Sequence, residues 1–184
     1  FLAELAPGTQ VAGVLTKSKT CSSAVDWCRT VLAKGKARGI IVNSGNSNAF
    51  TGKIGEKGTK HMVQAAADAL GCKPKQVLVA STGVIGEPIP GDRISAVLPT
   101  LVDGLGPDNW ADSAGAIMTT DTFPKLATAT AEIDGKEVRP DRARGRPGGS
   151  DAPTSRDACA PALRPVVRPR CRWRTRRSTW LQSP

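Results

Sequence analysis

The fold class of this chain can be inferred from residues 77–84, which are Val77-Leu78-Val79-Ala80-Ser81-Thr82-Gly83-Val84. Four apolar residues in a row are typical of a short strand buried on both faces. Gly39-Ile40-Ile41-Val42 is a second run of this kind, and a helical pattern lies between the two. Strands that alternate with helices predict an α/β protein.

The other elements follow from apolar spacing and from the positions of glycine and proline. Strands are expected at residues 11–16 and 126–133, and Asp134-Gly135 indicates a tight turn into residues 136–138. Helices are expected at residues 22–32, 62–70, 94–101 and 110–118, with Ser22 or Ser23 as the first cap. Pro99 predicts a short or irregular third helix, and residues 43–58 are expected to form a polar loop.

Charge is distributed unevenly along the chain. Residues 1–138 hold 11 Lys and 3 Arg against 13 Asp and Glu, whereas residues 139–184 hold 12 Arg and no Lys against 3 Asp. The formal net charge of +10 therefore lies almost wholly in the last 46 residues. Residues 1–138 are long enough for one domain with a hydrophobic core.

The tail, residues 139–184, also holds 7 of the 14 prolines and has no helical or strand periodicity. A composition rich in Arg, Pro, Ala and Gly is typical of GC-rich codons read in a shifted frame, and the change from Lys to Arg is abrupt, so we interpret the tail as out-of-frame or disordered. The alternative is a basic arm that binds nucleic acid, with Trp173 and Trp180 stacking on bases. Charge runs without a motif are usually only solvated, so this alternative is less favoured.

No motif indicates a metal, a nucleotide or a membrane. The five cysteines lack zinc-ligand spacing, so reduced thiols are expected, and His61 is expected on a helix surface. Gly45 and Gly52-Lys53 are too far apart for a phosphate loop, and Ile54 stands where that loop needs Ser or Thr. No apolar run approaches the roughly 18 residues that span a bilayer, and no signal peptide is visible, so a cytoplasmic location is expected.

The second apolar strand ends in two hydroxyl side chains and a residue without a side chain, namely Ser81, Thr82 and Gly83. Acyl transfer builds negative charge on a carbonyl oxygen, and preformed donors aimed at that oxygen contribute a few kcal/mol. A Thr hydroxyl and the N–H of a Gly suit this purpose, although the residues alone favour a plain turn. Residues 43–48 are equally consistent with a ligand role and with a loop that bonds its own backbone.

These segments resemble the ornithine acetyltransferase family, the glutamate N-acetyltransferases of arginine biosynthesis. The resemblance rests on Asn-Ser-Gly-Asn at 43–46, Ser-Thr-Gly-Val-Ile-Gly at 81–86 and Ala-Ile-Met-Thr-Thr-Asp-Thr-Phe-Pro-Lys at 116–125, in this order. It extends from about Gly8 to Val138 and covers most of the first, or α, half of the family's precursor.

The resemblance implies an N-terminal-nucleophile-like αββα sandwich, of which this chain holds a part. It implies that Thr82 and Gly83 form an oxyanion hole and that Thr119 contacts the substrate. Such enzymes cut themselves at an Ala-Thr bond, and the freed Thr moves an acetyl group from N-acetylornithine to glutamate. Some use acetyl-CoA as donor; no other cofactor and no metal is implied. Two α and two β chains are expected to assemble.

The sequence departs from the family pattern after Val138. No Lys follows Lys136, and Thr154 follows Pro153 in place of the Ala that precedes the family's nucleophile. The nucleophilic Thr and a substrate-binding Lys are therefore not expected in this chain, which we interpret as an inactive fragment. A self-processing amidase or aminopeptidase of similar architecture is the alternative enzyme, and the Met-Thr-Thr-Asp context of Thr119 favours the acetyltransferase.

Overall fold

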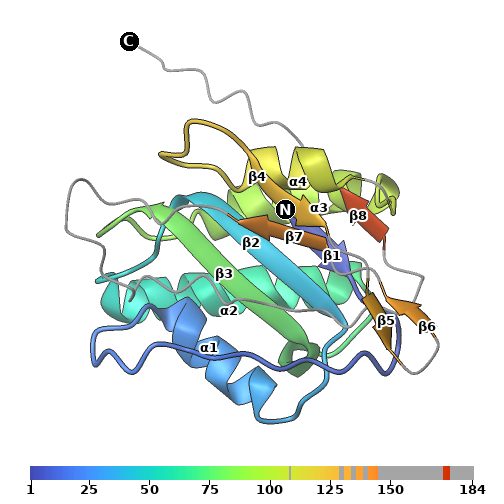
Figure 1. Cartoon of the computed structure of the whole chain (residues 1–184). Coiled ribbons are helices and arrows are strands. Elements are labelled where there is room, and N and C mark those ends of the chain that lie inside the picture. Colours follow the sequence, from blue (N-terminus) through green and yellow to red (C-terminus); the bar gives the residue numbers. More distant parts are fainter. Residues whose placement is uncertain (108, 129–130, 134–135, 139–140, 145–171, 175–184) are drawn as a thin grey trace.

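The structure is a computed structural model, and it describes residues 1–107, 109–128, 131–133, 136–138, 141–144 and 172–174 (Figure 1). The elements in chain order are β1 Leu2–Glu4, α1 Ser23–Leu32, β2 Gly39–Asn46, α2 Gly52–Ala69, η1 Pro74–Gln76, β3 Val77–Val84, α3 Gly91–Asp103, α4 Trp110–Ala116, β4 Lys125–Thr128, β5 Ala131–Ile133, β6 Lys136–Val138, β7 Asp141–Arg144 and β8 Arg172–Arg174. The strands form one sheet of order β3-β2-β1-β8 and two pairs, β4-β7 and β5-β6. The predicted α/β class is confirmed.

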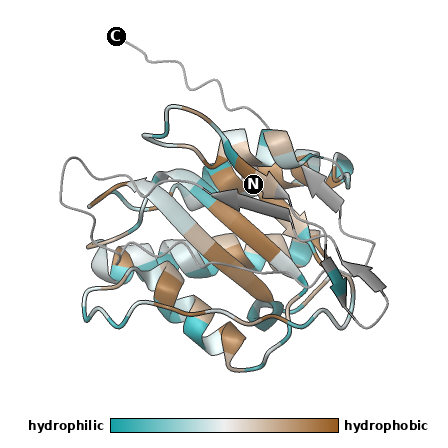
Figure 2. Ribbon diagram, viewed as in Figure 1, coloured by the Kyte–Doolittle hydropathy of each residue, from teal (hydrophilic) through white to brown (hydrophobic). Residues whose placement is uncertain are grey.

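β2 and β3 form a parallel pair at one side of the four-stranded sheet, and β1 pairs antiparallel with β2. The apolar first halves of both strands are buried, with Val77 and Leu78 at 0% exposure. Burial on both faces is the usual state of parallel strands and explains why these runs are continuously apolar. Figure 2 shows the brown first halves giving way to paler carboxyl ends, where the polar residues lie.

Three helices supply much of the core around this sheet. α2 packs along β2 and β3 and buries Met62, Val63 and Ala66, which share one helical face. α1 packs against β3 and α2, and α3 packs against α2 through Leu98 and Leu101 (Figure 1). The sheet end that carries the polar residues is thus held by a well-packed scaffold.

The outer edge of β3 is covered by α1. Trp27 Nε1 donates a hydrogen bond of 2.9 Å to the Val77 carbonyl, and Cys28 Sγ donates one of 3.0 Å to the Val79 carbonyl. The two donors satisfy carbonyl groups on the side of β3 away from β2. Cys28 is 1% exposed, and burial raises the pKa of its thiol to about 11.

The raised pKa of Cys28 predicts a specific loss of stability in alkali. The fold favours the neutral thiol, so the contribution of Cys28 to the free energy of unfolding is fully present below pH 9.0, its ordinary pKa, and disappears as the pH approaches 11.

At about pH 8 we expect iodoacetamide to modify Cys21 and Cys72 in the folded chain and to leave Cys28 unmodified. Peptide mass mapping measures this, with urea-unfolded chain as the control. Modification of folded Cys28 as fast as Cys21 would contradict the prediction.

The strand expected at residues 11–16 is wrong. Gln10 makes a single antiparallel bridge with Lys36, after which the segment runs over the surface with Val14 73% exposed. Among the described residues no strand pairs with residues 11–16, so this apolar run has no ladder to join.

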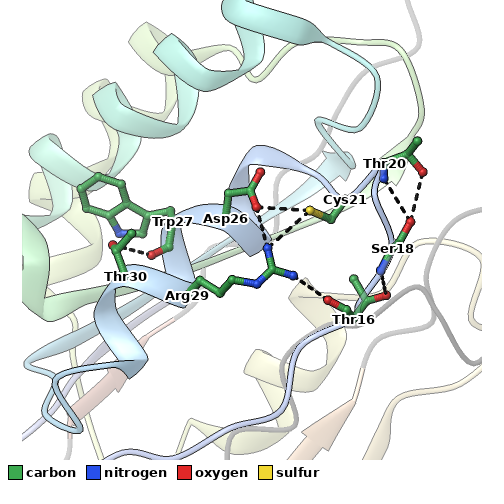
Figure 3. Close-up of polar contacts among 8 residues, drawn as sticks. All are labelled: Thr16, Ser18, Thr20, Cys21, Asp26, Trp27, Arg29 and Thr30. Carbon is green, nitrogen blue, oxygen red and sulfur yellow. Dashed lines mark hydrogen bonds and ion pairs between the residues drawn. The ribbon is translucent and has the colours of Figure 1, made fainter.

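Polar contacts hold this surface segment against the start of α1 (Figure 3). Arg29 donates to the Thr16 carbonyl at 2.6 Å and pairs with Asp26 at 2.7 Å. The Cys21 thiol donates to the same carboxylate at 3.2 Å. All these groups are substantially exposed, so the contacts fix the path of the chain more than they stabilise the fold.

Several elements are longer than the sequence pattern predicts. β2 continues to Asn46 and β3 to Val84, and α2 begins at Gly52 inside the expected loop. Pro99 lies within α3, which stays continuous over 13 residues, so the expectation of a short helix is wrong. Burial of Leu98 and Leu101 outweighs the missing N–H of one proline.

The turn expected at Asp134-Gly135 lies outside the described residues, but the strands around it, β5 and β6, pair antiparallel. Within the tail, β7 pairs with β4 and β8 pairs with β1, two strands that the sequence pattern does not predict. The remainder of the tail lies outside the described residues, so its interpretation stays a prediction. In the described part of the chain, no helix has the length and apolar character to cross a membrane.

Candidate functional site

The two polar segments singled out in the sequence lie side by side in the sheet. The parallel register of β2 and β3 places Ser44 beside Thr82 and Gly45 beside Gly83. These residues were expected beyond the strand ends, and the structure corrects this because the β2–β3 pairing continues through them. They still lie at the carboxyl edge of the parallel pair, where α/β proteins commonly place ligand sites.

Thr82 and Ser44 share one face of the sheet, because residues paired in register point to the same side. On this face Ser44 Oγ donates a hydrogen bond of 3.0 Å to the Met118 carbonyl. The bond ties the end of β2 to the residue before Thr119. The structure therefore brings Thr82 and Gly83 into one region with the segment that carries Thr119.

An ion pair fixes the chain on the carboxyl side of Thr119, opposite the Met118 bond. Lys125 Nζ pairs with the carboxylate of Asp121, whose side chain is fully buried, and it lies 4.8 Å from the centre of the Phe123 ring. A buried carboxylate requires such a partner. The Met118 bond and this pair together fix the path of the chain on both sides of Thr119.

Ser81 does not join this group, because successive side chains along a strand point to opposite faces. Its side chain faces the start of α1 and lines a cavity of about 10 Å³ with Ser22 and Val25. The Ser81 hydroxyl is buried and has no hydrogen-bond partner among the described residues. Of the two neighbouring hydroxyls, Thr82 alone lies on the face of Ser44.

Gly83 has a conformation and a position that only glycine fits. Its φ is +126°, and a Cβ atom would lie 2.3 Å from the carbonyl carbon and oxygen of Gly45 and 2.8 Å from the Asn46 nitrogen. Gly45 has the same φ of +126°. The two backbones thus approach each other without side chains between them, which the sequence alone does not indicate.

Asn48, for which the sequence is equally consistent with a ligand role and a loop role, is a structural residue. It is 1% exposed with φ of +54°, and its Nδ2, which has two hydrogens, lies 2.8–2.9 Å from three acceptors, Ser23 Oγ, the Gly55 carbonyl and Thr59 Oγ1. Its Oδ1 accepts from Thr51 Oγ1 at 2.9 Å. The amide therefore joins the first turns of α1 and α2 and has no group left for a ligand.

A cavity of about 590 Å³ opens between the same two helix starts, beside Trp27, Phe50 and Glu56. Its charged side chains are already neutralised: Glu56 pairs with Lys60 at 2.6 Å, and the other acid, Asp26, pairs with Arg29. The cavity therefore offers no unpaired acidic side chain to a ligand. Within the described residues, no cluster of His, Cys, Asp and Glu is placed to hold a metal.

His61 lies on the exposed side of α2, as predicted. Its Nε2 is 2.8 Å from Ser95 Oγ and joins α2 to α3. His61 therefore has a structural role in the packing of α2 against α3, and its Nε2 contact is made to α3 rather than to Ser44 or Thr82.

Comparison with known proteins gives a consistent result. The chain is 50% identical over 138 residues to the arginine biosynthesis bifunctional protein ArgJ of Bradyrhizobium diazoefficiens, covering 75% of this chain and 33% of that protein. It is 54% identical over 131 residues to the protein of the same name from Mesorhizobium japonicum, covering 71% and 32%. The chain therefore spans about a third of the length of these curated relatives.

Two solved structures share the fold. The ArgJ protein of Bacillus halodurans matches with a TM-score of 0.70 and 28% identity over 83% of this chain and 81% of that chain. Ornithine acetyltransferase from Mycobacterium tuberculosis, solved with ornithine, matches with a TM-score of 0.67 and 31% identity over 81% and 79%. These matches confirm the N-terminal-nucleophile-like α/β fold expected from the resemblance. The sequence pattern of the ArgJ family matches residues 1–141, and the chain belongs to the ArgJ family.

Proposed function

We propose that this chain is the first part of a bifunctional ornithine acetyltransferase of arginine biosynthesis, which moves an acetyl group from N-acetylornithine to glutamate. The observation that carries the proposal is the meeting of Ser44, Thr82 and Gly83 with the segment of Thr119. The relatives' names and the ornithine bound to the Mycobacterium tuberculosis enzyme support the same reaction class.

In this proposal Thr82 and Gly83 stabilise the transition state. A threonine elsewhere in the full enzyme attacks the acetyl carbonyl, and negative charge develops on the carbonyl oxygen. The Thr82 hydroxyl and the Gly83 N–H donate to that oxygen, where fixed donors act without reorganisation. Thr119 contacts the bound amino acid. The intermediate then collapses: its C–N bond breaks, ornithine leaves with the proton of the threonine hydroxyl on its amine, and the threonine carries the acetyl group as an ester. The amine of glutamate attacks this ester, and the threonine leaves with the amine proton as a free hydroxyl.

The nucleophile and a substrate-binding lysine would come from the two thirds of the relatives that this chain does not match. After Lys136 the sequence has no Lys, and Thr154 lacks a preceding Ala. We further propose a cytoplasmic assembly of two α and two β chains, with acetyl-CoA as a second donor. No metal takes part in this scheme.

A chimera tests the proposal. Residues 1–138 of this chain replace the matching segment of the Bradyrhizobium diazoefficiens relative, and acetylglutamate formation from acetylornithine and glutamate is measured. We expect steady turnover and two bands on a denaturing gel for the chimera. The isolated 184-residue chain should give neither product nor cleavage, because it lacks the proposed nucleophile.

The unmodified relative is the control for the assay. An inactive chimera beside an active relative would overturn the acetyltransferase assignment of these residues. Turnover or self-cleavage by the isolated chain would overturn its description as a fragment without the nucleophile.

A further inference from the structure

We infer that Asn43 is a positioning residue for the Gly83 backbone, acting through Asn46, whose nitrogen belongs to the peptide group that lies against Gly83. The inference rests on the proposed function, in which the Gly83 N–H is an oxyanion donor. Nothing in the sequence distinguishes Asn43 from the other asparagines of its segment. The structure distinguishes it, because the Asn43 side chain binds the residue that lies against Gly83.

The Gly45–Asn46 peptide group fills the space where a side chain on Gly83 would stand. A Cβ atom on Gly83 would lie within 2.3 Å of the carbon and oxygen of this peptide and 2.8 Å from its nitrogen. The Gly83 α-carbon therefore rests against this one peptide plane. A rotation of that plane moves Gly83, because nothing lies between the two backbones.

Asn43 holds Asn46, the residue at the far end of that plane. Its Nδ2 donates a hydrogen bond of 2.9 Å to the Asn46 carbonyl, which belongs to the following peptide group, Asn46–Ser47, and this bond is part-buried. The bond spans Gly45, which has a φ of +126° and, as a glycine, no side chain to restrict its backbone. Without this bond, Asn46 loses the side-chain contact that holds it, and the Gly45–Asn46 peptide group loses the anchor at its Asn46 end.

Ser44, the next residue, provides a matched comparison. Its hydroxyl also makes one hydrogen bond to a backbone carbonyl, but the acceptor is Met118, beside Thr119. Asn43 and Ser44 thus make similar bonds from adjacent positions and act on different parts of the site. Loss of the Asn43 bond should affect the oxyanion donor, and loss of the Ser44 bond should affect substrate binding.

The first measurement uses the 184-residue chain itself and follows the Gly83 amide by ¹⁵N NMR. Asn43→Ala removes the donor without adding charge, and Asn43→Asp removes it while keeping the shape of the side chain. We expect both variants to displace the Gly83 amide resonance and to speed its hydrogen exchange. Ser44→Ala should leave that resonance in place. An unmoved Gly83 amide in both Asn43 variants, or equal displacement in all three, would overturn the inference.

The second measurement places the same changes in the chimera. Loss of the Asn43 donor should lower kcat by about ten- to a hundredfold with little change in KM, since a small misplacement of a catalytic group has effects of this order. Ser44→Ala should raise KM by roughly two- to tenfold and spare kcat. A merely structural role would give both residues the same pattern, and that result would overturn the inference. Should the unaltered chimera be inactive, the proposed function fails, and the Gly83 amide still decides the role of Asn43.

Discussion

Thr82→Ala in the chimera is expected to lower kcat by about a hundred- to a thousandfold and to leave KM nearly unchanged. The hydroxyl is proposed to donate to charge that exists only in the transition state, so ground-state binding does not depend on it. Removal of one oxyanion-hole donor costs roughly 3–4 kcal/mol in a well-studied hydrolase. Because the Gly83 N–H remains as a second donor, we expect the lower end of this range. Steady-state kinetics with acetylornithine and glutamate measure both constants.

Thr119→Ala is the control for this prediction. Thr119 follows Met118, which Ser44 binds, and its proposed contact is with the bound amino acid. Its loss should mainly raise KM. Near-wild-type kcat in Thr82→Ala would show that Thr82 is only a strand residue and would remove the oxyanion assignment.

Gly83→Ala is expected to cost the folded chain roughly 2–5 kcal/mol. The φ of +126° is unfavourable for any residue with a side chain, and a methyl group would meet backbone atoms of Gly45 at 2.3 Å. Backbone in a paired strand cannot yield as a flexible side chain can. Urea unfolding followed by circular dichroism measures the loss as a shift of the midpoint at constant slope.

Gly71→Ala separates the two causes. Gly71 also has a positive φ, of +60°, but a Cβ atom there would meet nothing within 4 Å. Its replacement should cost only about 1 kcal/mol, from the backbone conformation alone. Equal losses in the two variants would mean that the close approach of Gly83 to Gly45 has no energetic weight.

Local patterns predict the helices and the buried strands well. The helix at residues 22–32 and the apolar runs of β2 and β3 lie where the sequence places them, because apolar spacing and helix-ending residues are local signals. The sequence pattern does not predict that the 43–46 and 81–84 segments meet; they do so because β2 and β3 are neighbouring parallel strands, which end at the same edge.

Other features depend on partners far away in the chain and could not be predicted. Residues 11–16 are mostly apolar like a strand, but no strand in the described part of the chain lies beside them. Asn48 is committed to the scaffold by Ser23 and Thr59, which are 25 and 11 residues away. The Gly83–Gly45 approach requires the β2–β3 register, and no single segment encodes that register.

The cover that α1 places over β3 has a consequence for how the sheet can grow. Trp27 and Cys28 occupy the carbonyls that an incoming strand would need, so no further strand can align along the first half of β3. Sheet extension on that flank is closed, both to another copy of the chain and to added segments. Within the described residues the sheet continues only on the opposite side, where β8 pairs with β1, and this makes α1 a fixed boundary of the sheet.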